Sequence, residues 1–154
     1  MTNNAILQTE IGWANITGTD TVITRLFLQR EKPAEHEPTP LLRDAARQLA
    51  AYLRGDMHDF DLPLRADGSD FAKSVWAQML KVPYGRTRTY GDVANVLKAP
   101  AQLVGQACGQ NPIAIIIPCH RIVGTNWLGG YTSDLGVDAK AYLLDLESGQ
   151  ERLF

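Results

Sequence analysis

The segment PYGRTRTYGDVANVLKAPAQLVGQACG, residues 83–109, predicts two short helices joined by a tight turn. The first helix is expected from about Asp92 to Leu97. Pro100 suits the start of a second helix, which is expected to run to about Cys108. Two short helices joined in this way outline a helix-turn-helix, although many helical hairpins bind nothing. The segment therefore predicts a local fold, and its function has to be inferred from the rest of the chain.

Charged residues are unevenly distributed along the 154-residue chain. The net charge is −2, from 15 Lys and Arg against 17 Asp and Glu. Residues 71–125, which contain both predicted helices, hold six Lys or Arg and a single acid, Asp92, so this segment carries +5. A local positive field can attract a polyanion even when the whole protein is acidic. A solvated basic face explains the same pattern equally well.

The remainder of the chain predicts an α+β protein with two domains. The first 30 residues read as strands, and residues 40–54 have the apolar face and the flanking Pro and Gly of a helix. A polar, turn-rich segment then separates a domain of residues 1–66 from one of residues 67–154. Three further elements are expected in the second domain: a helix from Ser69 or Asp70, a buried strand from Ile113 to Ile117, and a last helix from about Asp138 to Glu147.

A cysteine and a histidine, Cys119 and His120, follow the apolar run directly. A thiol is a nucleophile only as its thiolate, and we expect the histidine to favour that form. In a regular strand the two side chains would point to opposite faces, so a working pair needs a break at Pro118 or a bridging water. Glu147 and Asp145 are the candidate carboxylates behind the histidine. For an isolated Cys-His pair, a buried thiol beside a surface histidine is the simpler interpretation.

Other classes of site find little support in the sequence. The two cysteines and three histidines form no recognisable metal-ligand spacing, so no metal site is expected. No glycine-rich nucleotide-binding loop follows a strand, so no nucleotide cofactor is implied. A thiol hydrolase of the Cys-His-Asn kind is not expected either, because the sequence contains no motif for one. The longest apolar run is far short of the ~20 residues of a membrane span, and the first ten residues do not resemble a secretory signal. We therefore expect a cytoplasmic protein with reduced thiols, no cofactor and no membrane contact.

The segment NPIAIIIPCHRIVG, residues 111–124, resembles the active-site segment of the O6-alkylguanine-DNA alkyltransferase family. Four other segments resemble further blocks of that family in the same order: FAKSVWAQMLKVPYGRTRTYGDVA, AQLVGQACGQNP, GGYTSDL and KAYLLDLE. The resemblance covers Phe71 to Glu147, and the acidic segment before it fits the family more loosely. It implies a small N-terminal α/β domain of the ribonuclease H-like kind, followed by a winged-helix-like domain that carries the helix-turn-helix.

The resemblance also implies an activity, which is DNA repair by irreversible transfer of an alkyl group. The group moves from O6 of guanine, and conceivably from O4 of thymine, to Cys119 after the damaged base is flipped out of the duplex. His120 acts as a base through a water, Glu147 orients it, and Asn111 helps to hold the site. Tyr90 crowds the target phosphate and assists protonation of the guanine. The implied partner is double-stranded DNA containing O6-alkylguanine, the protein is expected to be a monomer, and no cofactor is needed.

Further residues are assigned to substrate and DNA. The resemblance implies that Tyr131 lines the alkyl pocket, and Thr132 and Arg121 are expected beside it. The second predicted helix is built from small residues, including Ala101 and Gly105, which suit the narrow minor groove or close helix packing. The candidates for contacts with DNA phosphates are Arg86, Arg88 and Lys98.

Two departures from the family pattern bear on function. The family places an arginine in the second helix to fill the space left by the flipped base, whereas this chain has Gln102. Glutamine brings neither charge nor a broad stacking plane, so repair of duplex DNA is expected to be slower. The Gly-Gly pair that usually follows the pocket tyrosine is Ser133-Asp134 here. The alternative function is a sensor of alkylated DNA with weak or no transfer, which Gln102 allows and Cys119 argues against.

Overall fold

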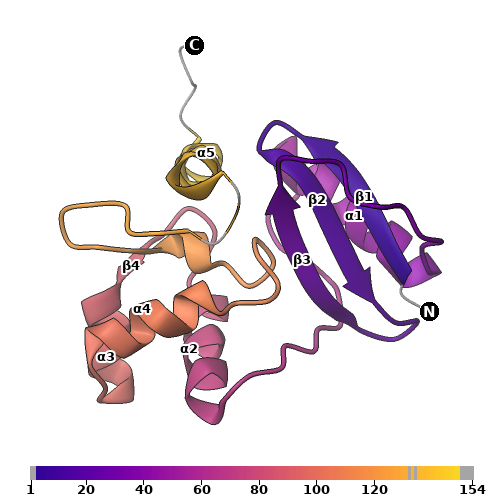
Figure 1. The fold of residues 1–154 in the computed structure, drawn as a ribbon. Coiled ribbons are helices and arrows are strands. Elements are labelled where there is room, and N and C mark those ends of the chain that lie inside the picture. Colours follow the sequence, from indigo (N-terminus) through magenta and orange to yellow (C-terminus); the bar gives the residue numbers. More distant parts are fainter. Residues whose placement is uncertain (1–2, 132, 134, 150–154) are drawn as a thin grey trace. The chain divides into compact units, whose positions relative to one another are not determined.

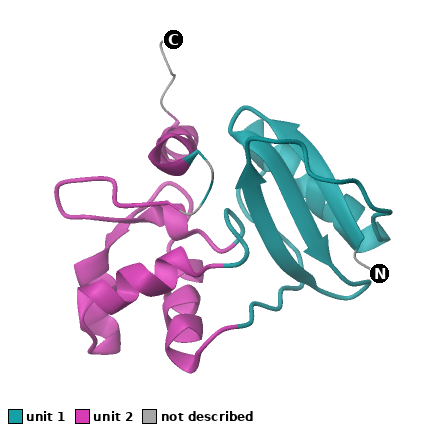
Figure 2. Ribbon diagram, in the orientation of Figure 1, with its two compact units in different colours: residues 1–67, 112–116, 133–135 teal, residues 68–111, 117–132, 136–154 magenta. Residues whose placement is uncertain are grey.

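The computed structural model describes residues 3–131, 133 and 135–149, and the chain divides into two compact units (Figures 1 and 2). The first unit holds the chain up to Asp67, and the second begins at Gly68. Segment 112–116 groups with the first unit although it lies far along the sequence. In the described ranges, no helix is long and apolar enough to cross a membrane.

The first unit is a three-stranded antiparallel sheet with one helix packed on it, as the sequence predicts. The strands lie in the order β1-β2-β3. Thr39 caps the helix, because its hydroxyl accepts a hydrogen bond from the Leu42 amide at 3.2 Å. The bounds are β1 Asn3–Thr9, β2 Gly12–Gly18, β3 Ile23–Gln29 and α1 Pro40–Leu53.

The core of this unit lies between the helix and the sheet. Leu42, Leu49 and Tyr52 of α1 are fully buried, and so are Ile16 and Leu28 of the sheet. Burial of each such side chain stabilises a fold by roughly 1.5–3 kcal/mol relative to an exposed position. The helix therefore binds the sheet through the apolar face that its sequence periodicity predicts.

The second unit contains the predicted helix-turn-helix, formed by α3 and α4. Helix α3 begins two residues earlier than expected, because Thr89 and Asp92 form a capping box that starts the helix at Tyr90. Lys98 ends it in the left-handed conformation, with φ of 55°. The bounds are α2 Asp70–Leu80, β4 Arg88–Thr89, α3 Tyr90–Leu97, α4 Ala101–Gly109, a 3₁₀ turn Cys119–Arg121, β5 Ile122–Val123 and α5 Gly136–Ser148.

The prediction of a buried strand from Ile113 to Ile117 is wrong, because the structure forms only an isolated β-bridge between Ile113 and Leu26 of β3 in this segment. Instead the chain turns sharply at Ile115, which has φ of 71°, and the Ile116 amide donates to the Ala114 carbonyl at 2.8 Å. This i to i+2 bond defines a γ-turn, which is rare and strained for a β-branched residue. All five residues are buried. A run of apolar residues indicates that a segment is buried, but it does not show whether the buried segment is a strand or a turn.

Candidate active site

A second tight turn places Cys119. Pro118 has φ of −82° and ψ of 69°, and the Cys119 amide donates to the Ile117 carbonyl at 2.8 Å. These values define an inverse γ-turn. The chain then continues as the 3₁₀ turn Cys119–Arg121. The break at Pro118 that a working Cys-His pair requires is therefore present.

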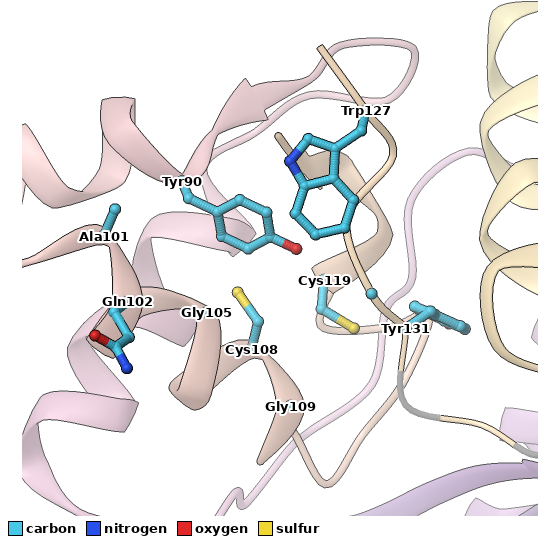
Figure 3. A pocket seen from close by; sticks show the side chains of 10 residues that line it. Tyr90, Ala101, Gln102, Gly105, Cys108, Gly109, Cys119, Trp127 and Tyr131 are labelled. Carbon is cyan, nitrogen blue, oxygen red and sulfur yellow. The ribbon is translucent and has the colours of Figure 1, made fainter. Parts of the chain in front are cut away.

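Cys119 lies in a cavity of about 510 Å³ within the second unit (Figure 3). Cys119 as a whole residue is only 6% exposed. The cavity contains three aromatic rings and no charged side chain among its lining residues. In Figure 3 the Cys119 sulfur points toward Tyr131, whereas the Cys108 sulfur points away from it, toward the side of Tyr90. The lining residues are Tyr90, Ala101, Gln102, Gly105, Cys108, Gly109, Cys119, Trp127, Gly130 and Tyr131.

Behind the thiol, Glu147 holds the side chains of His120 and Arg121 in place. Its Oε2 lies 2.8 Å from Nε2 of His120, and Nε and Nη2 of Arg121 donate to the two carboxylate oxygens at 2.8 Å each. The third guanidinium nitrogen, Nη1, donates to the Val82 carbonyl at 2.7 Å. Nδ1 of His120 is buried and has no hydrogen-bond partner among the residues that the structure describes. With Nε2 donating to the carboxylate, Nδ1 is the nitrogen that can accept a proton.

Cys119 and His120 are both expected to be uncharged at rest. Burial lowers the pKa of His120, although the hydrogen bond to Glu147 opposes that shift. Burial also raises the pKa of the Cys119 thiol, and the opposing effects of Asn111, Lys140 and the local backbone amides do not cancel it. The expectation of a favoured thiolate at rest is therefore wrong, because desolvation outweighs the nearby basic groups. A neutral histidine beside a neutral thiol can take up its proton as the thiol reacts.

Lys140 is a site residue that the sequence reasoning missed. Its side chain is fully buried, and its Nζ donates to the carbonyls of Ile122 at 2.6 Å and Gly130 at 3.1 Å. The ammonium also lies 5.8 Å from the centre of the Tyr90 ring. A buried lysine stabilises nearby negative charge and ties the strand after Cys119 to the loop that lines the cavity. The signal was available, since Lys140 lies on the apolar stripe of α5 with Leu143, where a lysine is uncommon.

Replacing Lys140 with methionine is expected to raise the pKa of Cys119 further, because the nearest positive charge is lost. Iodoacetamide should then modify Cys119 several-fold more slowly at pH 8, with the whole profile displaced to higher pH. Two carbonyls also lose their donor, so the free energy of unfolding should fall by about 1–3 kcal/mol. The measurement is the rate of modification against pH, in a Cys108→Ser background that leaves one thiol.

Lys140→Arg is the matched control, since it keeps the charge and should keep most of the wild-type pH profile. A Lys140→Met profile that coincides with the wild-type profile would show that the ammonium has no electrostatic effect on Cys119.

The structure brings most of the sequence-predicted site residues together. Cys119, Tyr90 and Tyr131 line the cavity, as do Ala101, Gln102 and Gly105 of α4. Glycine is also needed at position 129, beside the lining residue Gly130, because a Cβ added at Gly129 would overlap the Tyr90 hydroxyl. The Tyr131 hydroxyl is buried without a partner in the described part of the chain.

Other predicted residues lie elsewhere. Arg121 does not line the cavity, since its guanidinium is taken up by Glu147 and the Val82 carbonyl. Asn111 is buried, and its Nδ2 donates to the Ile117 carbonyl at 2.8 Å, which supports the turn before Cys119. Thr132 lies outside the described residues. Arg86, Arg88 and Lys98 are exposed.

Metal chemistry finds no site in the part of the chain that the structure covers. Among the described residues, no three His, Cys, Asp or Glu side chains converge to hold an ion. Both cysteines, Cys108 and Cys119, are free thiols. The chemistry that this arrangement can perform is nucleophilic attack by sulfur, assisted by a histidine base.

Fold and site together define a two-domain α+β protein whose helix-turn-helix unit encloses a thiol backed by histidine and carboxylate. Residues 70–149 match the model of the 6-O-methylguanine DNA methyltransferase DNA binding domain, and residues 4–66 match its ribonuclease-like domain. This chain belongs to the 6-O-methylguanine DNA methyltransferase family.

Individual relatives agree over nearly the whole chain. A Methanosarcina barkeri protein named methylated-DNA–protein-cysteine methyltransferase is 43% identical over 156 residues, covering 96% of this chain and 98% of its own. The crystal structure of Mycobacterium tuberculosis O6-methylguanine methyltransferase is similar with a TM-score of 0.85 at 34% identity, covering 100% of this chain and 97% of that one. A structure of the M. tuberculosis protein in complex with DNA gives a TM-score of 0.86 at 38% identity, covering 98% and 96%.

Proposed function

We propose that this protein repairs DNA by transferring the alkyl group of O6-alkylguanine to its own Cys119. One observation carries the proposal: Cys119 lines a neutral cavity that helix α4 of the helix-turn-helix also lines. A base that leaves the duplex at α4 would therefore reach the thiol without crossing the protein. His120, the proton acceptor next to the thiol, is held by a 2.8 Å hydrogen bond between its Nε2 and Oε2 of Glu147.

The transfer is a displacement at the alkyl carbon. The Cys119 sulfur forms a bond to this carbon while the bond from carbon to O6 breaks, and the guanine leaves with the bonding electrons. The thiol proton passes to Nδ1 of His120 through a water, because in the described part of the chain no direct hydrogen bond joins Nδ1 to the thiol. Burial raises the pKa of Tyr90 and keeps it protonated until the guanine departs and takes its proton; the phenolate then regains a proton from solvent, and the His120 imidazolium returns its proton to solvent. The resulting thioether is stable, so each molecule acts once, and no cofactor enters the balance.

The surrounding residues keep this geometry. Asn111 supports the turn that ends at Cys119. Arg121 contributes by holding Glu147, in place of the substrate contact expected from the sequence. Tyr131 offers an unpaired buried hydroxyl to the base, and burial raises its pKa well above the usual value, so it can donate a hydrogen bond. Each of these groups is then an element of a site formed before the substrate arrives.

DNA is the partner, and α4 is the element that meets it. Its exposed start carries Ala101 and Gln102, and Gly105 follows one turn later. These short side chains suit a minor groove that is only ~6 Å wide and reads little sequence. Tolerance of sequence is what a repair protein needs, because damage occurs in any context. We propose further that the target is O6-alkylguanine and that the protein acts as a monomer in the cytoplasm.

Intact-mass measurement tests the proposal. After mixing with a duplex that contains one O6-methylguanine, the protein should gain about 14 Da, the mass difference of one methylation. The unmodified duplex is the control and should leave the mass unchanged. Binding of the lesion without any gain in mass would favour a lesion sensor. The relatives that match are named methyltransferases, so the sensor is not favoured.

Removing three exposed basic residues should weaken binding to all DNA sequences about equally. Arg86, Arg88 and Lys98 are our candidates for phosphate contacts, and each contact releases counterions from the duplex. In the triple alanine variant, the slope of log affinity against log salt should flatten by up to about 3, at roughly 0.9 for each phosphate contact. Fluorescence anisotropy with unmodified duplex from 50 to about 300 mM salt measures this slope.

Lys32→Ala is the matched control, since Lys32 is exposed, belongs to the first unit and pairs with Glu35. A triple-variant slope equal to that of the wild type would place the DNA-binding face elsewhere on the protein.

A further inference from the structure

Trp127 is the most exposed of the large apolar side chains in the described part of the chain. It is 67% exposed, although tryptophan is usually well buried. The residue lies in the loop between β5 and α5 and lines the cavity that holds Cys119. Its indole lies against Gly124, where an added Cβ would overlap the ring. An exposed indole held in this way at a cavity suits a ligand with an aromatic face.

The position of the indole relative to the other lining groups narrows the choice of ligand. In Figure 3, Trp127 stands on the loop side of the thiols and Gln102 on the α4 side. Among the described residues, no charged side chain lines the cavity, and the other lining rings are Tyr90 and Tyr131. A planar, uncharged ligand with polar edges therefore fits this lining, and a purine has these properties.

We propose that Trp127 stacks on the extruded alkylguanine and so determines how tightly the flipped base is held. This inference rests on the proposed function and adds a residue that the proposed mechanism does not use. A base loses its stacking partners on leaving the duplex, and an aromatic side chain restores part of that stabilisation regardless of sequence.

Rates of alkyl transfer test the proposal. Trp127→Ala should raise the half-saturating concentration of both an O6-methylguanine duplex and the free base O6-benzylguanine by about 10- to 100-fold, the range for a lost base–aromatic stack. The maximal rate should change little, because Trp127 does not touch the reacting bond. Trp127→Phe should recover part of the affinity. Leu128→Ala is the matched control, since Leu128 is exposed on the same loop but does not line the cavity.

Three results would count against the role of Trp127 or against the proposed function itself. A loss confined to the duplex would mean that Trp127 acts in the DNA stack, which overturns the proposal. Unchanged half-saturation for both substrates overturns it as well. If the wild-type protein transfers no alkyl group to either substrate, the proposed function itself fails.

Fluorescence provides a second readout that does not depend on transfer. In the Cys119→Ser protein, an O6-methylguanine duplex should quench the emission of Trp127, whereas Trp13 and the buried Trp76 should contribute little change. The quench should disappear in the Cys119→Ser, Trp127→Phe double variant. Because this variant keeps a ring at position 127, it decides the question even if Trp127→Ala does not fold. A quench of the same size in both proteins would overturn the proposal.

Discussion

Replacing Cys119 with serine is expected to abolish alkyl transfer and to leave DNA binding largely intact. A serine hydroxyl at this position is a far weaker nucleophile than a thiol, and a neutral His120 is too weak a base to ionise it. DNA binding should survive because the proposed DNA contacts lie on α4 and on Arg86, Arg88 and Lys98, and none of them is made by the thiol. Single-turnover assays on an O6-methylguanine duplex measure transfer, and anisotropy on the same duplex measures affinity.

Cys108→Ser is the matched control for this variant. Cys108 lines the same cavity, and burial together with the nearby Cys119 raises the pKa of its thiol to about 12. It should therefore stay protonated and unreactive, and Cys108→Ser should transfer the alkyl group at nearly the wild-type rate. Substantial transfer by Cys119→Ser would refute the assignment of Cys119 as the acceptor.

Replacing Glu147 with glutamine is expected to slow alkyl transfer by about 10²-fold or more, the lower end of what a positioned general base contributes. The carboxylate fixes the tautomer of His120 and stabilises the imidazolium that forms as the thiol ionises. The change also leaves the buried Arg121 without its counter-charge, which costs about 3–5 kcal/mol of stability. Transfer rates are to be measured well below the melting temperature, and DNA affinity in the Cys119→Ser background.

Arg121→Met separates the two roles of Glu147. It breaks the same buried ion pair but keeps the bond between Glu147 and His120. A comparable loss of stability with a much smaller loss of transfer rate would show that Glu147 acts through the histidine. If Arg121→Met slows transfer as much as Glu147→Gln does, the carboxylate is a structural residue.

Local signals predicted much of the fold correctly. The capping residue Thr39 with Pro40 identified α1, and the short helices around Pro100 identified the helix-turn-helix. These features depend on neighbours a few residues apart, so a single sequence shows them. The first unit also includes segment 112–116, which no local pattern could reveal because the contact is between distant parts of the chain.

The site was predicted less completely than the fold. Cys119, His120 and Glu147 followed from the thiol and from the family resemblance, and the structure brings them together. The protonation state of the thiol was predicted wrongly, because burial depends on the whole fold and opposes the adjacent histidine. Lys140 was missed, since its ammonium reaches the site from a helical position 21 residues beyond Cys119.

Mapping the transferred methyl group to a residue tests the central claim most directly. The wild-type protein, after one equivalent of O6-methylguanine duplex, would be digested and sequenced by tandem mass spectrometry. We predict a single modified peptide, with S-methylcysteine at Cys119 and an unmodified thiol at Cys108. Methylation at Cys108, or at any residue other than Cys119, would contradict the account.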